Sequence, residues 1–227
     1  MLTIKRAGAI AAAATASLAL AAGAATAVAP SGSGPSFGAF GAFGAFGAAQ
    51  AGGTLLPVPT NHVRAIGHAS VSVVGDTALV TVDATGLLDG VPHAMHIHID
   101  GAGTCPTAAA ARDHNGHKTI NVADAMANYG MIGTSLTTSG DSSPASGLAV
   151  DRFPAHGTFH YQRLLHLSAD TVANVKAGKA VVVVHGIDYN HNGTYDGVLG
   201  ASELDPSLPA EATDPALCGT LHPAGLG

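Results

Sequence analysis

The chain has 227 residues, of which 47% are apolar and 11% are charged, a composition sufficient for one buried hydrophobic core. Its formal net charge of -6 lacks the basic excess that binding to a phosphate backbone requires, so nucleic acid is not an expected partner. Thirteen histidines outnumber the nine lysines and arginines, and this excess favours metal ligation.

Residues 1–27 have the features of a secretory signal peptide. Lys5 and Arg6 precede an alanine-rich apolar run that ends in small residues, and we expect cleavage after Ala27. A membrane anchor is the alternative, but the run is short and weakly apolar for a span of about 20 residues. The mature protein is therefore expected to be secreted or held in the cell envelope, without a stable membrane span.

Residues 28–53 are rich in glycine and alanine and contain a Phe-Gly-Ala repeat. Glycine at every third position costs too much backbone entropy for a helix, so this composition predicts a linker. The alternative is a segment for self-association or attachment to the cell envelope. The folded domain is expected over residues 54–227. The repeat places four phenylalanines at Phe37, Phe40, Phe43 and Phe46.

Downstream of Thr54, short β-branched runs such as SVSVV, ALVTVDATG and AVVVVHG are separated by Gly, Pro and Asp. Convincing helical periodicity occurs only in SADTVANVKAG, where we expect Ser168 to cap a two-turn helix that stops at Gly178. The sequence therefore predicts an all-β fold, a Greek-key barrel or sandwich with one short helix.

The stretch PHAMHIHID, residues 92–100, suggests a metal site. In a strand, His96 and His98 project from the same face with Cα atoms about 6.6 Å apart, so one copper or zinc ion can accept both imidazoles. The side chain of His93 points elsewhere and is expected to be structural. The alternative for such a pair alone is a polar stripe on a solvated strand face.

The chain has two cysteines, Cys105 and Cys218. In a protein with an export signal, a disulfide between them is the natural expectation. Two free thiols that bind a metal are the alternative.

Several motifs occur in the order found in one known family. GLLDGVPHAMHIH, residues 86–98, leads into the His-x-His pair, Cys105 follows, VVVVHG ends in His185, and Cys218 and Gly219 lie near the end. Over roughly residues 60–220, this order resembles the Cu,Zn superoxide dismutases. The resemblance implies a Greek-key β-barrel of that type, with superoxide as the substrate.

The resemblance also implies a ligand set. His96, His98 and His185 would be the catalytic copper ligands, with His114 as the fourth, bridging ligand and His117 as its competitor. Neutral imidazoles support both oxidation states of copper, as superoxide disproportionation requires. The choice between copper and zinc, and the oligomeric state, a homodimer being one option, stay open.

Other positions depart from the family. Tyr129 and Met131 stand where it supplies further zinc ligands, so zinc is not expected, and Pro215 replaces its substrate-guiding arginine. These departures favour a copper-only or degenerate member. LSADTVANVKAGKAVVVVHG is similar to the end of the chordin-type (CHRD) repeat, which also carries a His-x-His. The alternative function is therefore an extracellular domain that binds copper or calcium without catalysis.

The stretch DYNHNGTYD, residues 188–196, has the spacing of a calcium loop, with Gly193 at the sharp turn. The closing bidentate glutamate is missing, since Leu199 stands in its place. One alternative is a turn whose side chains hydrogen-bond to their own backbone, and another is that Asp188 orients a metal-binding histidine. The predicted calcium ligands are Asp188, Asn190, Asn192, Thr194 and Asp196.

Overall fold

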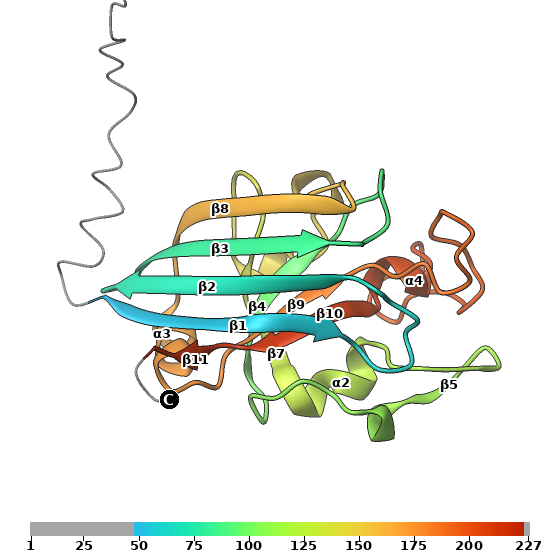
Figure 1. Cartoon of the computed structure of the whole chain (residues 1–227), viewed down its shortest axis with the longest axis horizontal. Coiled ribbons are helices and arrows are strands. Elements are labelled where there is room, and N and C mark those ends of the chain that lie inside the picture. The colour runs from blue at the N-terminus through green and yellow to red at the C-terminus, as the bar shows by residue number, and fades with distance from the viewer. Residues whose placement is uncertain (1–47, 225–227) are drawn as a thin grey trace, which may run out of the picture. The chain divides into compact units, whose positions relative to one another are not determined.

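A computed structural model describes residues 48–224 (Figure 1). The predicted signal peptide and residues 28–47 of the predicted linker lie outside the described residues. The strands are β1 (Ala49–Pro57), β2 (Ile66–Val74), β3 (Thr77–Thr85), β4 (Met95–Asp100), β5 (Arg112–His114), β6 (His117–Thr119), β7 (Gly130–Ser135), β8 (Thr158–His166), β9 (Val181–His185), β10 (Pro215–Thr220) and β11 (His222–Pro223).

The main sheet has the strand order β7-β4-β9-β10-β1-β2-β3-β8, and β11 pairs with β1. All of these pairings are antiparallel. The sheet curls into a half-barrel, with β2, β3 and β8 in front of β4 and β9 (Figure 1). A separate hairpin consists of β5 and β6. The predicted all-β fold is therefore confirmed for the described part of the chain.

Within residues 48–224, three α-helices accompany the sheet: α2 (Val122–Tyr129), α3 (Ala169–Lys176) and α4 (Ala210–Thr213). The predicted helix is confirmed as α3, because the Ser168 side chain accepts a hydrogen bond from the backbone of Thr171 and Gly178 follows with a φ of 68°. The sequence did not predict α2 or α4. Three short 3₁₀ helices complete the described elements: η1 (Ala108–Ala110), η2 (Pro144–Ser146) and η3 (Val150–Arg152).

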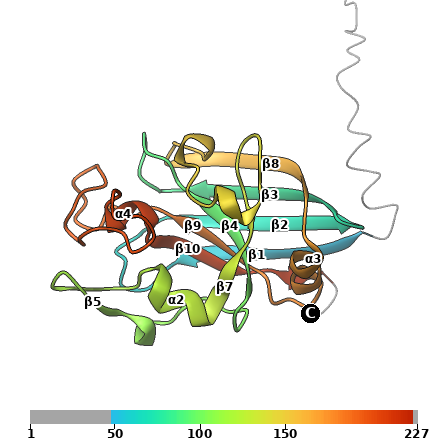
Figure 2. The ribbon, with the colours of Figure 1, turned by 180° about the vertical axis from the view of Figure 1, so that it is seen from behind.

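The two faces of β4 and β9 are both buried, but against different parts of the protein. Alternate residues of these strands, such as Ile97 and Val182, point into the main core inside the curled sheet. The intervening residues point outward, where Val181 and Val183 pack with Tyr129 of α2. Seen from behind, α2 lies against this outer face and α4 lies near its end (Figure 2). The even-numbered histidines of β4 therefore lie on the outer face, beneath α2.

The first strand begins inside the segment that composition predicts to be linker. β1 takes in residues 49–53, which pair with β2, so the boundary expected at residue 54 is corrected to Ala49. A Cβ on Gly53 would collide with the carbonyl oxygen of Thr220, so glycine permits the close approach of β10 here. The glycines that suggest a linker thus serve strand packing at this edge.

The predicted disulfide between Cys105 and Cys218 is confirmed. It joins the loop after β4 to β10, and both cysteines pack against the cluster beneath α2. A disulfide is typical of proteins that fold in an oxidising environment. Among the helices within residues 48–224, none is long and apolar enough to cross a membrane.

Candidate metal centre

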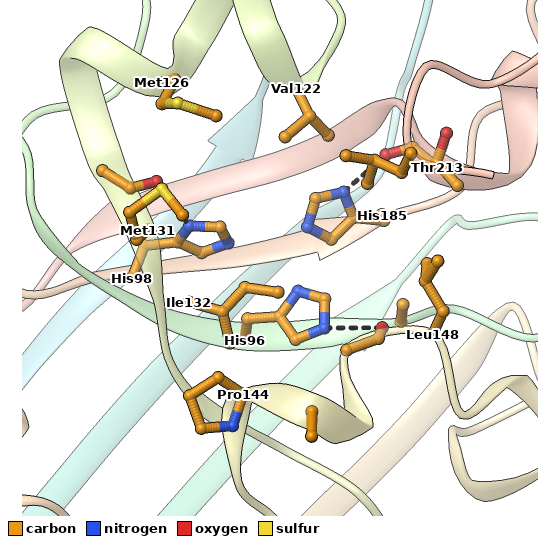
Figure 3. A pocket seen from close by; sticks show the side chains of 15 residues that line it. His96, His98, Val122, Met126, Met131, Ile132, Pro144, Leu148, His185 and Thr213 are labelled. Atoms are coloured by element: carbon orange, nitrogen blue, oxygen red, sulfur yellow. Dashed lines mark hydrogen bonds between the residues drawn. The ribbon is translucent and has the colours of Figure 1, made fainter.

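Three histidines from two adjacent strands meet on the outer face of the sheet. His96 lies opposite Val183 in the register of β4 and β9, so His185, two residues further along, is its diagonal neighbour on the same face. His98 follows His96 with a spacing of two residues. One nitrogen from each of His96, His98 and His185 lies within 4.8 Å of the other two, and the three rings converge on a common point (Figure 3). This arrangement can hold a metal ion.

Backbone carbonyl groups orient all three rings. His96 Nε2 lies 3.0 Å from the Gly147 oxygen, His98 Nδ1 lies 3.1 Å from the Gly130 oxygen, and His185 Nδ1 lies 2.7 Å from the Thr213 oxygen. A carbonyl oxygen can only accept, so each of these nitrogens is the donor.

The other nitrogen of each ring carries a free lone pair. His96 Nδ1, His98 Nε2 and His185 Nε2 are buried and have no hydrogen-bond partner. A buried polar atom without a partner is costly, and metal ligands commonly donate their second ring nitrogen to a carbonyl group. The donor set therefore fits a metal ion bound through one Nδ1 and two Nε2 atoms.

Burial keeps the three imidazoles neutral. It is the main cause that lowers the pKa of His98 to about 3 and that of His185 to about 4, and it holds the pKa of His96 well below its ordinary value. The neighbouring His185 adds to the effect on the other two. Because a metal binds the deprotonated ring, the site stays competent for binding at mildly acidic pH.

A glycine at the end of α2 positions His98. Gly130 has a φ of 84° and a ψ of -152°, a combination that is essentially restricted to glycine. A Cβ at this position would also collide with the carbonyl oxygen of Ile99. Helix α2 itself begins with a capping box between Asn121 and Asp124. The carbonyl group of Gly130, at the C-terminal end of α2, therefore orients the His98 ring.

A pocket of about 350 Å³ opens over the histidines. Its polar lining consists of the three histidines and Thr213, and none of the described residues that line it is charged. A small molecule can therefore approach the unpartnered nitrogens from the pocket, although the described lining itself offers no charged side chain that would attract an anion. The apolar side of the lining includes Leu204 and, as Figure 3 shows, Val122, Met126, Met131, Ile132, Pro144 and Leu148.

The structure brings together three of the five histidines that the resemblance implies as ligands. His114 and His117 lie in the β5–β6 hairpin and, within the described chain, are not part of the three-histidine group. His114 Nε2 instead lies 2.7 Å from a carboxylate oxygen of Asp124, and the His117 ring lies against that of Tyr189. Their role as ligands stays a prediction. Tyr129 and Met131, which stand where the resembled family has further zinc ligands, both lie at the site. The Tyr129 ring packs on His98, with centroids 4.5 Å apart, and Met131 lines the pocket.

His93 is structural, as the strand pattern predicts. Its side chain is fully buried, and its two nitrogens lie 2.7 Å from the Leu88 oxygen and 3.0 Å from the His185 oxygen. The contact with the His185 oxygen links His93 to the backbone of a candidate metal ligand. His93 therefore supports the end of β9 without pointing into the pocket.

The predicted calcium loop follows β9 and is closed by its own hydrogen bonds. The Asp188 carboxylate accepts from the backbone of Asn192 and Gly193, each at 2.9 Å, and Asp196 accepts from the Asn190 side chain at 3.0 Å. Such bonds agree with the alternative prediction of a self-bonded turn. Calcium binding by Asp188, Asn190, Asn192, Thr194 and Asp196 stays a prediction.

Sequence reasoning missed Glu211 and Asp214, which are both buried. Glu211 accepts hydrogen bonds from the backbone of Tyr189 and Asp196 and so ties the loop to α4. Neither oxygen of the Asp214 carboxylate has a hydrogen-bond partner, and burial is the main cause that raises its pKa to about 9, with nearby acidic groups adding to the effect.

A comparison of the sequence with protein-family models and with curated proteins finds no match in either.

Proposed function

We propose that the protein binds one copper ion through His96 Nδ1, His98 Nε2 and His185 Nε2. Two observations carry this proposal: one nitrogen from each of the three buried histidines lies within 4.8 Å of the other two, and each ring has one buried nitrogen without a hydrogen-bond partner. Imidazole is a good ligand for copper, and among divalent first-row ions copper binds nitrogen sites most tightly. The curled antiparallel sheet and the order of motifs support a fold of the Cu,Zn superoxide dismutase type, in a copper-only form.

The reaction that we propose is the disproportionation of superoxide. Bound copper would supply the one-electron chemistry that this reaction needs. The protein contributes neutral imidazoles that keep their orientation through backbone carbonyl groups, and a pocket through which a small molecule reaches the site. The disulfide and the predicted signal peptide support a location outside the cytoplasm, secreted or in the cell envelope.

A second candidate is copper binding without turnover, as in a CHRD-like extracellular domain. The specific observation in its favour is the uncharged lining of the pocket among the described residues. Pro215, which stands where the family has its guiding arginine, is buried in β10 and offers no charge. Such a site would store or sense copper, or would brace the fold.

The test begins with elemental analysis of the mature protein for copper, zinc and calcium. Copper in a one-to-one ratio that is lost in His98→Gln would support the site, and His68→Gln, on an exposed part of β2, is the matched control. Superoxide consumption by the copper-loaded protein, abolished in His185→Ala, would support the enzyme. Copper without such activity would favour the binding role. The absence of copper binding to the metal-free protein would contradict both.

A further inference from the structure

Two methionines stand at the mouth of the three-histidine pocket. The chain has four methionines, of which Met95 is fully buried in the main core, whereas Met126 and Met131 line the pocket and are 41% and 58% exposed. They come from different elements, α2 and β7, and both lie on the side of the pocket that His98 occupies (Figure 3). Two flexible thioethers therefore reach both the solvent and the space over the histidines.

The uncharged lining of the pocket makes entry easier for a monovalent ion than for a divalent one. The three nitrogens are neutral, and no carboxylate among the described residues belongs to the group. The surroundings are mostly apolar, with a described lining that carries no charge. The cost of placing an ion in a medium of low dielectric constant rises with the square of its charge, so a monovalent ion passes through this uncharged pocket at a lower cost than a divalent one.

Thioethers are soft ligands that suit Cu(I) better than hard cations, whereas zinc in proteins is bound by cysteine, histidine and carboxylate side chains. We propose that copper enters this site as Cu(I) and that Met126 and Met131 are its transient ligands at the pocket mouth. This inference rests on the proposed function, since it concerns how the three-histidine site is filled. The thioethers meet the ion from solvent, and the buried nitrogens of His96, His98 and His185 then hold it.

The order of exposure supports this sequence of contacts. The methionines are at least 41% exposed, whereas each of the three histidines is at most 3% exposed. An ion that enters through the pocket therefore meets sulfur before it meets nitrogen. Sulfur donors at the mouth allow Cu(I) to shed its previous ligands stepwise, so that the ion is never without donors in an apolar channel.

The test measures Cu(I) uptake by the metal-free protein. Cu(I) is supplied without oxygen as its bicinchoninate complex, and the loss of the complex's absorbance is followed by stopped flow. The Met126→Leu/Met131→Leu double variant should take up Cu(I) on the order of tenfold more slowly than the wild type. Its final copper content should be unchanged, because the three histidines remain. The Met131→Leu single variant should show an intermediate rate.

Two controls make the result specific. Met95→Leu carries the same side-chain change in the core, away from the pocket, and should leave the uptake rate unchanged. Zinc uptake by the double variant should also match that of the wild type, since the usual protein ligands of zinc are cysteine, histidine and carboxylate side chains and not methionine.

The outcomes separate this inference from the proposed function. Equal Cu(I) uptake rates in the wild type and the double variant, both fully loaded, would overturn the methionine role and leave the copper site standing. A wild type that does not retain Cu(I), or that retains it equally well as His98→Gln, would overturn both. Slower zinc uptake in the double variant would also contradict the inference, because it would indicate damage to the pocket and not the loss of a soft ligand.

Discussion

Acid should destabilise the metal-free protein through the buried histidines that form the candidate metal centre. In the folded state the pKa of His98 is about 3 and that of His185 is about 4, whereas the ordinary value is 6.5. The unfolded chain therefore takes up protons first as the pH falls below 6.5. The contribution of these groups to stability is fully present above pH 6.5 and is lost as the pH falls toward their folded pKa values.

The magnitude follows from the same values. At pH 5 the solution lies about 1.5 pH units below the ordinary histidine pKa, and each pH unit is worth about 1.4 kcal/mol. Each of His98 and His185 should then cost about 2 kcal/mol of unfolding free energy between pH 7.5 and pH 5. His96, whose pKa is also well below its ordinary value, changes stability in the same direction. The loss from His98 and His185 together is about 4 kcal/mol, which is large compared with the stability of about 5–15 kcal/mol that is typical of a folded domain.

Urea denaturation of metal-free protein at pH 7.5 and pH 5 measures this loss. In His98→Gln the loss between the two pH values should be smaller by about 2 kcal/mol, since glutamine takes up no proton. In the control His68→Gln, which changes an exposed side chain of β2, it should equal that of the wild type. If His98→Gln lost as much stability as the wild type over this interval, the assignment of a buried, neutral imidazole would be refuted.

Three further predictions concern stability. The pKa of the Asp214 carboxyl group is about 9 in the folded protein, so the folded state keeps a proton that the unfolded chain releases near pH 4. The free energy of unfolding should therefore fall as the pH rises from 4 to 9. Asp214→Asn should remove this fall, as urea denaturation at pH 5 and pH 8.5 would reveal, and an unchanged slope would contradict the prediction. Replacing Cys105 and Cys218 by serine opens a cross-link with a sequence separation of 113 residues, and in the chain-entropy model this should cost about 4 to 5 kcal/mol in the free energy of unfolding. A melting temperature that is indifferent to a reducing agent would count against this. Gly130→Ala should destabilise the protein by at least about 1–3 kcal/mol and weaken metal binding, because the backbone that orients His98 must move. Metal affinity equal to that of the wild type, measured by chelator competition, would disprove the positioning role.

The period of a β-strand was enough to predict two of the three histidines of the candidate metal centre. His96 and His98 share a face because they are two residues apart in β4, and the burial of both faces of that strand follows from the cover by α2. His185 came from a resemblance in motif order, and the structure brings it into the same group. The register between β4 and β9, which determines the actual distance, depends on the whole sheet and not on local pattern.

Other features were missed for identifiable reasons. Helix α2 has a capping-box signal, Asn121 followed by Asp124, but its short alanine-rich sequence does not show a clear apolar period. The start of β1 was misplaced because Gly52 and Gly53 look like linker residues, although they permit close packing between strands. The partners of the three imidazoles were invisible in the sequence, because every residue has a carbonyl group and only the folded chain path selects which one is used.

Main-chain carbonyl groups orient all three imidazoles, and this makes the site tolerant of sequence drift except at Gly130, where the backbone conformation requires glycine. At Gly147 and Thr213, as at any position, a substitution that preserves the chain path preserves the acceptor oxygen. The side chains around the pocket are then free to change in size and polarity without turning the ligands. A family of proteins with this backbone can therefore vary what enters the pocket while retaining the same three nitrogen donors, and so can acquire new reactivity one rim residue at a time.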